Sequence, residues 1–234
     1  MFKSLIFALV LALGVVTPAT VPTQPVASAT YNVTLDQQHA TTHRIGVYDM
    51  IDGLAAEEGH CSATAVGPHA LLTAQHCFAD SNLVRLDNNT QPTVITSVLL
   101  DGQDHVIYIV DATFDHWADI TQRNIIAREP VHIWGNPGNS PDVWRDGYYV
   151  GLEDVPMKSI KKLLGLIDEA KSVTLLKFIL PIYPGDSGSG IFDASGQVIA
   201  VITYGDASAE NFDYPLSFTA AQLHSIAGER GLLK

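Results

Sequence analysis

The chain has 234 residues, of which 47% are hydrophobic and 16% are charged, and its formal net charge is -12. A chain of this length and apolar content can bury one full hydrophobic core, so we expect one folded domain. The negative charge argues against nucleic acid or an anionic membrane as a partner, since both would repel an acidic surface.

The N-terminus has the pattern of an export signal. Lys3 precedes an apolar run over residues 5–16, which has the length of a signal-peptide core and is too short to span a bilayer comfortably. Small residues at 27–29 predict cleavage before Thr30, with residues 17–19 as a second candidate site and an uncleaved anchor as the alternative. We therefore predict a signal peptide over residues 1–29, a secreted or extracytoplasmic protein, and no stable membrane association after signal removal.

Residues 30–44 are expected to form a propeptide or N-terminal extension, and residues 45–234 the folded domain. From Gly46 onward, short apolar runs alternate with turn clusters, a pattern typical of an all-β barrel or sandwich. These clusters lie at residues 67–68, 87–89, 101–102, 136–139 and 195–196.

Two segments depart from the strand pattern. Residues 157–172 have apolar side chains at helical spacing, which predicts a short amphipathic helix inserted between two strands. Residues 219–231 predict a C-terminal helix, with Ser217 or Thr219 as its N-cap and Gly231 as its stop.

Two sequence stretches carry candidate chemistry. The first, CSATAV at 61–66 followed by ALLTAQHC at 70–77, contains His76; the second, YPGDSGSG at 183–190, surrounds Ser187 with glycines. Glycine permits positive φ and close backbone approach, so such a turn can display a nucleophile and converge its N–H groups on one point. Serine with glycine is also ordinary turn composition. A serine hydroxyl needs an adjacent base, and histidine titrates in the useful range.

In this order, the two stretches resemble the chymotrypsin-like (trypsin-like) serine proteases, and the resemblance spans residues 46–205. It implies an all-β fold of two six-stranded antiparallel β-barrels. It also implies a disulfide between Cys61 and Cys77, which have the family's sixteen-residue separation. The implied activity is that of a serine endopeptidase acting on protein or peptide substrates, as a monomer and without a metal or cofactor.

The resemblance also implies the role of each site residue. His76 would be the general base and Ser187 the nucleophile, with the N–H groups of Gly185 and Ser187 as the oxyanion hole. The acid of the triad must lie between His76 and Ser187. Asp104 fits best because an apolar strand pattern follows it directly, and Asp101 and Asp119 are the alternatives.

The family's primary specificity pocket corresponds here to six residues, namely Pro181, Ile182, Ile202, Thr203, Tyr204 and Gly205. Trypsin-like members have Asp at the position of Pro181, and glutamyl endopeptidases have His in the strand that here spans residues 201–205. Neither is present. A charged substrate side chain would therefore be desolvated without a partner, so we predict cleavage after apolar or small residues.

Arg44-Ile45 resembles the activation cut of the trypsin family, in which a new N-terminal Ile pairs with the Asp before the nucleophile, here Asp186. Only sixteen residues separate Ile45 from Cys61, fewer than in the animal enzymes, and many bacterial relatives do without the cut.

Three other classes of protein fit the sequence less well. An α/β-hydrolase would place its serine before its acid and histidine, the reverse of the order here. A metal enzyme could be drawn from histidines such as His39 and His43, but no His-Glu-x-x-His or Cys-x-x-Cys set accompanies them. A non-catalytic binding protein of the protease fold would have lost triad residues, and all three candidates are present.

Overall fold

The structure is a computed structural model that describes residues 34–51, 54–77, 81–87, 89–140, 143–156, 172–205 and 209–227. The predicted signal peptide and residues 157–171 of the predicted inserted helix lie outside these ranges. Within them, no helix is long and apolar enough to cross a membrane.

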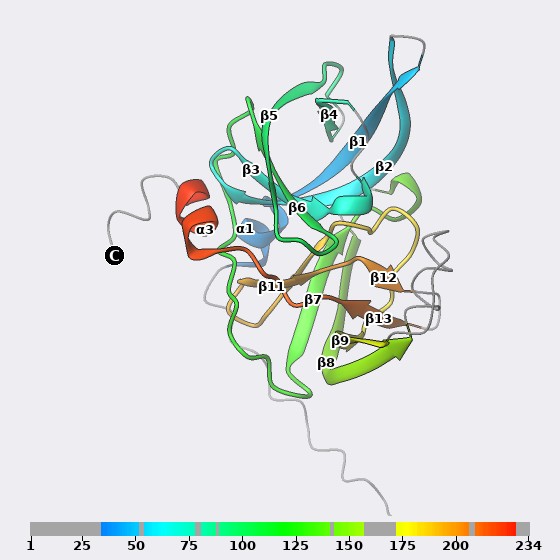
Figure 1. The fold of residues 1–234 in the computed structure, drawn as a ribbon, viewed down its shortest axis with the longest axis vertical. Helices are drawn as coiled ribbons and strands as arrows, with labels where there is room; N and C mark the ends of the chain where they lie inside the picture. Colours follow the sequence, from blue (N-terminus) through cyan, green and yellow to red (C-terminus); the bar gives the residue numbers. More distant parts are fainter. Residues whose placement is uncertain are drawn as a thin grey trace, which may run out of the picture.

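Six antiparallel strands close into a barrel in the order β1-β2-β3-β6-β5-β4, the upper unit in Figure 1. Its interior is filled by aliphatic side chains such as Ile45, Leu71 and Val106, all fully buried. Burial of these apolar groups stabilises the barrel. The strands are β1 Thr42–Ile51, β2 Leu54–Gly67, β3 Ala70–Ala74, β4 Leu83–Leu86, β5 Thr93–Leu100 and β6 His105–Val110.

The second unit is a seven-stranded sheet in the order β11-β10-β7-β8-β9-β13-β12. Its core contains Ile133, Phe178 and Leu180, which are fully buried. The strands are β7 Pro130–Gly135, β8 Val143–Pro156, β9 Ser172–Ile179, β10 Gly190–Phe192, β11 Val198–Val201, β12 Tyr204–Gly205 and β13 Glu210–Asp213.

The all-β fold class is confirmed, and the second unit differs in detail from the six-stranded barrel expected. Residues 202–203 do not pair with another strand, and they divide what would otherwise be one strand into β11 and β12. These two strands stand at opposite ends of the strand order. Because only these two residues separate β11 from β12, the two ends of the sheet meet and the sheet curls round on itself. A shared core that includes Leu72 and Ile107 from the barrel and Phe192 and Val201 from the sheet joins the two units.

Two short α-helices are described, α1 Leu35–His39 and α3 Ala220–Ile226, beside the 3-10 turns Gln75–Cys77 and Pro137–Asn139. The predicted N-cap Thr219 is confirmed for α3: its hydroxyl accepts a hydrogen bond from the Gln222 N–H. The helix ends at Ile226, earlier than the predicted stop at Gly231, with Ala227 as its C-cap. The buried Ile226 anchors this end in the shared core.

The described part of the predicted propeptide or extension packs into the domain. Gln38 is 1% exposed and its Oε1 lies 2.5 Å from His132 Nε2. The Thr41 carbonyl accepts a hydrogen bond from the Ala65 N–H at 2.7 Å. β1 then begins at Thr42, before the predicted domain start.

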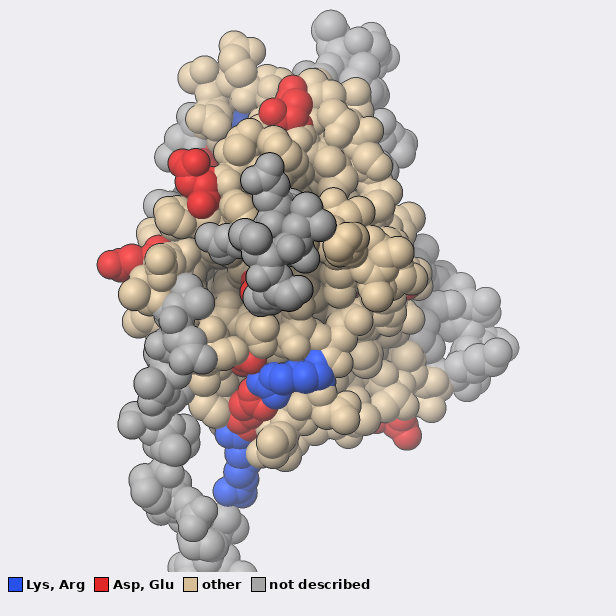
Figure 2. All heavy atoms as spheres, turned by 90° about the vertical axis from the view of Figure 1, so that its left-hand side faces the viewer, with Lys and Arg blue, Asp and Glu red and all other residues tan. Residues whose placement is uncertain are grey.

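Figure 2 shows one face of the molecule, where acidic side chains are scattered and basic side chains gather at the lower edge, next to acidic ones. Among the described residues of this face, the charges thus form local pairs and single groups instead of a broad basic patch.

Candidate active site

His76 and Asp104 are brought together by the pairing of β3 with β6. This pairing places Ala74 opposite His105, so the end of β3 adjoins the start of β6. His76 Nδ1 and Asp104 Oδ2 are 2.7 Å apart, and the His76 N–H donates to Asp104 Oδ1 at 2.9 Å. One carboxylate thus holds both the ring and the backbone of His76.

The other two candidate acids lie elsewhere. Asp101 is bonded to His105. The Asp119 carbonyl accepts a hydrogen bond from the Val198 N–H, beside β11. The geometry therefore favours Asp104 as the partner of His76.

Cys61 and Cys77 form the expected disulfide, which is confirmed, with Cα atoms 6.3 Å apart. It ties the 3-10 turn that carries His76 to β2, and closing a loop of this size contributes about 3 kcal/mol in the chain-entropy account. Cys77 Sγ lies 3.8 Å from the Ser187 carbonyl oxygen. That oxygen accepts a hydrogen bond from the Ser62 N–H at 2.7 Å. The serine turn is therefore docked on the same strand and disulfide that hold His76.

Two glycines of the turn occupy positions that a side chain could not. Gly185 has φ +103° and Gly188 has φ +87°, in the left-handed region that favours glycine. A Cβ at residue 188 would overlap Thr73 Oγ1 and the Ser62 carbonyl oxygen, and one at residue 185 would lie 2.6 Å from the Asn136 carbonyl oxygen. The backbone of the turn thus packs closely against the first barrel at Gly188 and against the residue after β7 at Gly185.

The amides of the turn divide into two groups. Those of Asp186, Gly188 and Ser189 donate to the carbonyls of Tyr183, Ile202 and Asp186, respectively, at 2.8–3.0 Å. The N–H groups of Gly185 and Ser187 donate to no other described residue. An oxyanion hole requires two backbone donors that are free in this way. Within the described chain Ser187 Oγ also has no hydrogen bond, and in unliganded enzymes catalytic hydrogen bonds are often long.

Asp186 is fully buried and forms an ion pair with Arg145 of β8, with Oδ1 and Nη2 2.5 Å apart. Its Oδ2 accepts a hydrogen bond from the Tyr183 N–H at 2.7 Å. Burial raises the pKa of Asp186, while the Tyr183 amide and the Arg145 guanidinium oppose this rise. A Cβ on Gly135 would overlap both partners, so this glycine makes room for the pair.

The six predicted pocket residues divide by burial. Pro181 is exposed and Ile182 is half-buried. Ile202, at 3% exposure, packs in the core of the second sheet instead of lining an opening. The space where Gly205 would carry a Cβ is filled by Ile182 Cδ1 and Asn211 Oδ1.

Thr203 and Tyr204 are turned toward carboxylates. The Thr203 hydroxyl donates to Asp213 Oδ1 at 2.6 Å. Burial raises the pKa of Tyr204, and the charge of Asp104 and its hydrogen bond with Tyr204 add to this rise. Tyr204 therefore contacts the candidate triad acid.

Two residues beside the site were missed by sequence reasoning. Arg145 lies in a strand, where nothing in the sequence shows that its guanidinium points inward. Asn211 is 2% exposed and its Nδ2 donates to the Leu180 carbonyl, while its Oδ1 has no hydrogen-bond partner among the described residues. No motif surrounds Asn211, so the sequence gives no sign that its side chain is buried beside the site.

A closed barrel packed on a curled sheet, with a serine turn between them, is the architecture of the trypsin-like peptidase fold. The family described as a trypsin-like peptidase domain matches residues 61–201, which include His76, Asp104 and Ser187, and the chain belongs to this family. No curated protein matches the sequence.

Solved structures show the same fold. The chain is similar to the active form of the Rv3671c protease from M. tuberculosis, at 19% identity and a TM-score of 0.64, over 83% of this chain and 84% of that one. The inactive form of that protease gives 17% identity and a TM-score of 0.61, over 83% and 93%. A serine endoprotease from Yersinia pestis gives 17% and 0.55, over 78% of this chain and 62% of that one. At these identities the likeness shows a shared fold.

Proposed function

We propose that the protein is a serine endopeptidase that hydrolyses peptide bonds through a triad of Ser187, His76 and Asp104. The observation that carries the proposal is the 2.7 Å contact between His76 Nδ1 and Asp104 Oδ2. Because a carboxylate only accepts hydrogen bonds, this contact supports an imidazole proton on Nδ1, with the lone pair of Nε2 available as a base.

The chemistry follows from this tautomer. His76 Nε2 takes the proton of Ser187 as Oγ attacks the carbonyl carbon of the substrate. The N–H groups of Gly185 and Ser187 hold the developing oxyanion, and each such donor lowers the barrier by about 3 kcal/mol. His76 then protonates the leaving amine, and water hydrolyses the acyl-enzyme by the same sequence of proton transfers.

Exposure supports this division of roles. The Asp104 side chain is 11% exposed and that of His76 is 30% exposed. The acid is thus shielded from water, which strengthens its interaction with the ring, while the ring remains accessible from one side.

The proposed substrates are proteins or peptides with an apolar or small residue before the scissile bond. Pro181, Ile182 and Gly205 would border that side chain, and none of them carries a charge. Beside Gly205, the Oδ1 of Asn211, which has no hydrogen-bond partner among the described residues, adds a single neutral acceptor. A charged substrate side chain would lose its water there without gaining an ionic partner.

We also propose that the protein acts outside the cytoplasm. The apolar run over residues 5–16 supports export. The disulfide between Cys61 and Cys77 suits an oxidising compartment, where such bonds persist.

The test is digestion of casein peptides, with the new termini identified by mass spectrometry and Ser187→Ala as the matched control. We expect cleavage by the wild type alone, mainly after apolar or small residues. Equal digestion by Ser187→Ala would refute the peptidase, and cleavage chiefly after Arg, Lys or Glu would refute the preference.

A further inference from the structure

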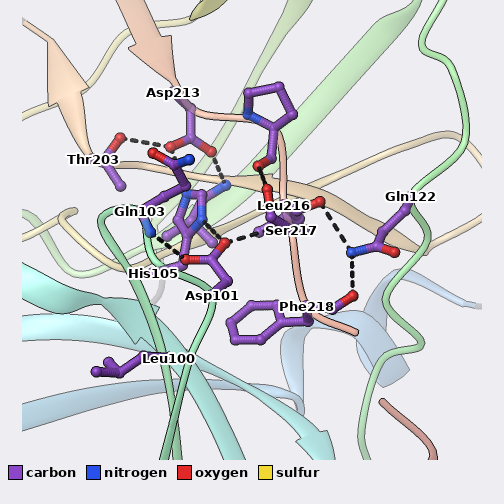
Figure 3. A network of polar contacts seen from close by, with 12 residues as sticks. Leu100, Asp101, Gln103, His105, Gln122, Thr203, Asp213, Leu216, Ser217 and Phe218 are labelled. Carbon is purple, nitrogen blue, oxygen red and sulfur yellow. Dashed lines mark hydrogen bonds and ion pairs between the residues drawn. The ribbon is translucent and has the colours of Figure 1, made fainter. Parts of the chain in front are cut away.

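A second histidine lies between two carboxylates next to the candidate triad acid. His105 is the first residue of β6, and its Nδ1 is 2.7 Å from Asp101 Oδ2 while its Nε2 is 2.8 Å from Asp213 Oδ1. The three side chains are at most 1% exposed. Figure 3 shows the imidazole with one carboxylate on either side.

The hydrogen bonds determine the charge of this ring. Both carboxylates accept further donors: Asp101 accepts the N–H groups of Gln103 and Ser217, and Asp213 accepts the Val201 N–H and the Thr203 hydroxyl, all at 2.6–3.1 Å. In each of these contacts a carboxylate oxygen is the acceptor.

Because an ionised carboxylate only accepts, each ring nitrogen of His105 must donate, which requires the imidazolium. Burial alone would lower the pKa of His105, but the charge of Asp213 and the hydrogen bonds to Asp101 and Asp213 outweigh burial and raise it to about 10. The buried cluster thus contains one cation between two anions.

This cluster connects the two halves of the active site. Asp101 and His105 flank Asp104 in the β5–β6 turn of the barrel, whereas Asp213 is the last residue of β13 in the second sheet. Asp213 in turn accepts hydrogen bonds from the N–H of Val201, the last residue of β11, and from the hydroxyl of Thr203, within the break before β12. The barrel supplies His76 and Asp104, and Ser187 lies just before β10 of the sheet. The alignment of acid, base and nucleophile therefore depends on how these two units are joined.

We propose that His105 is a positioning residue for peptide hydrolysis: as an imidazolium between Asp101 and Asp213, it holds the turn that carries Asp104 against the sheet that carries Ser187. The inference rests on the proposed triad. A neutral side chain at residue 105 would leave two buried carboxylates without their cation, and the turn would shift to relieve them. Misplacement of a catalytic group by about 1 Å can lower the rate by about 100-fold.

The first test is the protonation of the ring in the full wild-type protein. With 15N-labelled histidine, NMR should show one-bond N–H coupling at both ring nitrogens of His105 at about pH 8.5, two units above the ordinary pKa of histidine. His105→Gln assigns the signals by their loss. Coupling at only one of the two nitrogens would overturn the inference.

The second test separates positioning from folding. Titration with a fluorophosphonate counts the competent serines, and peptide hydrolysis per titrated serine then excludes unfolded protein from the rate. For His105→Gln we expect turnover per titrated serine to fall about tenfold or more, with KM within about twofold of wild type. His69→Gln, the same change at an exposed histidine of the barrel, is the matched control and should leave turnover unchanged.

A role in stability alone would lower the number of titrated serines and leave turnover per serine within about twofold of wild type, and that result would overturn the inference. If His105→Gln gives no folded protein, Asp101→Asn is measured in the same way, since it removes one charge and keeps an acceptor oxygen. A wild type that does not label would instead overturn the proposed function, and the NMR experiment would still report the state of His105.

Discussion

Arg145 Nη2 lies 2.5 Å from Oδ1 of Asp186, the buried residue directly before Ser187. A cation from within the folded domain thus occupies the place that the resembled animal enzymes give to a new N-terminus. The carboxylate that shapes the serine turn is already paired with Arg145, so we expect the turn to form without an N-terminal ammonium group. Ile45, the candidate new N-terminus, is fully buried inside β1, where it pairs with Cys61 and Leu86.

Replacing Arg145 by Met should abolish most hydrolysis and destabilise the fold, because it leaves Asp186 buried without its cation. Breaking such a pair costs about 3–5 kcal/mol. Peptide hydrolysis and urea denaturation measure the two effects. The control is Arg128→Met, which removes an exposed arginine. Wild-type activity in Arg145→Met would contradict the role given to this ion pair.

Arg44→Gln should leave the enzyme fully active, because the described turn is formed with the bond between Arg44 and Ile45 intact. N-terminal sequencing of active wild type should find a start other than Ile45. An active form that begins at Ile45, together with an inactive Arg44→Gln variant, would show that cleavage is required.

Gly188→Ala should lose fluorophosphonate labelling and stability together. The added Cβ would overlap Thr73 Oγ1 and the Ser62 carbonyl oxygen, and φ at this position is +87°. Gly151→Ala is the control, since residue 151 also has positive φ, +153°, but no atom lies within 4 Å of the added Cβ. Equal labelling of the two variants would show that the turn can move away from the barrel.

Stability should fall in acid because of His132. Burial lowers the pKa of His132 to about 4, so between about pH 4 and 6.5 the unfolded chain binds a proton that the folded protein does not. The free energy of unfolding should therefore decrease by about 1.4 kcal/mol per pH unit as pH falls through this range. Urea denaturation of wild type and His132→Phe at several pH values measures this decrease. If the unfolding free energy of the variant fell as steeply with pH as that of wild type, groups other than His132 would cause the loss of stability.

His105 should produce the opposite dependence in alkali. Its pKa is raised to about 10 in the folded protein, so its contribution to stability is complete below the ordinary histidine pKa of about 6.5. That contribution should be lost as pH rises toward about 10. Urea denaturation between these two pH values should show a decrease in the unfolding free energy of wild type and a smaller decrease in His105→Gln.

Local patterns were sufficient to predict much of the site. The glycines around Ser187 and the spacing of Cys61 from Cys77 are properties of short segments, so they can be seen in the sequence. The choice of Asp104 rested on the strand pattern that follows it, and the pairing of β3 with β6 is what places it beside His76.

Contacts between distant segments could not be predicted. The ion pair of Arg145 with Asp186 and the contact of His105 with Asp213 depend on which side chains of paired strands face inward. A shift of the strand register by one residue would turn each of these side chains to the other face. Ile202 lies in the break between β11 and β12, and its packing in the core instead of the pocket likewise depends on distant segments. The extra charge of His105 depends on a carboxylate 108 residues away.

The most direct test of the central claim is to locate a fluorophosphonate adduct by mass spectrometry in wild type, Ser187→Ala, His76→Ala and Asp104→Asn. The account predicts one adduct on Ser187 in wild type, none in Ser187→Ala, and labelling slowed by orders of magnitude in the other two variants. Removing a triad member costs about 10⁴-fold or more in related enzymes. An adduct on another residue, or labelling of His76→Ala at the wild-type rate, would contradict the account.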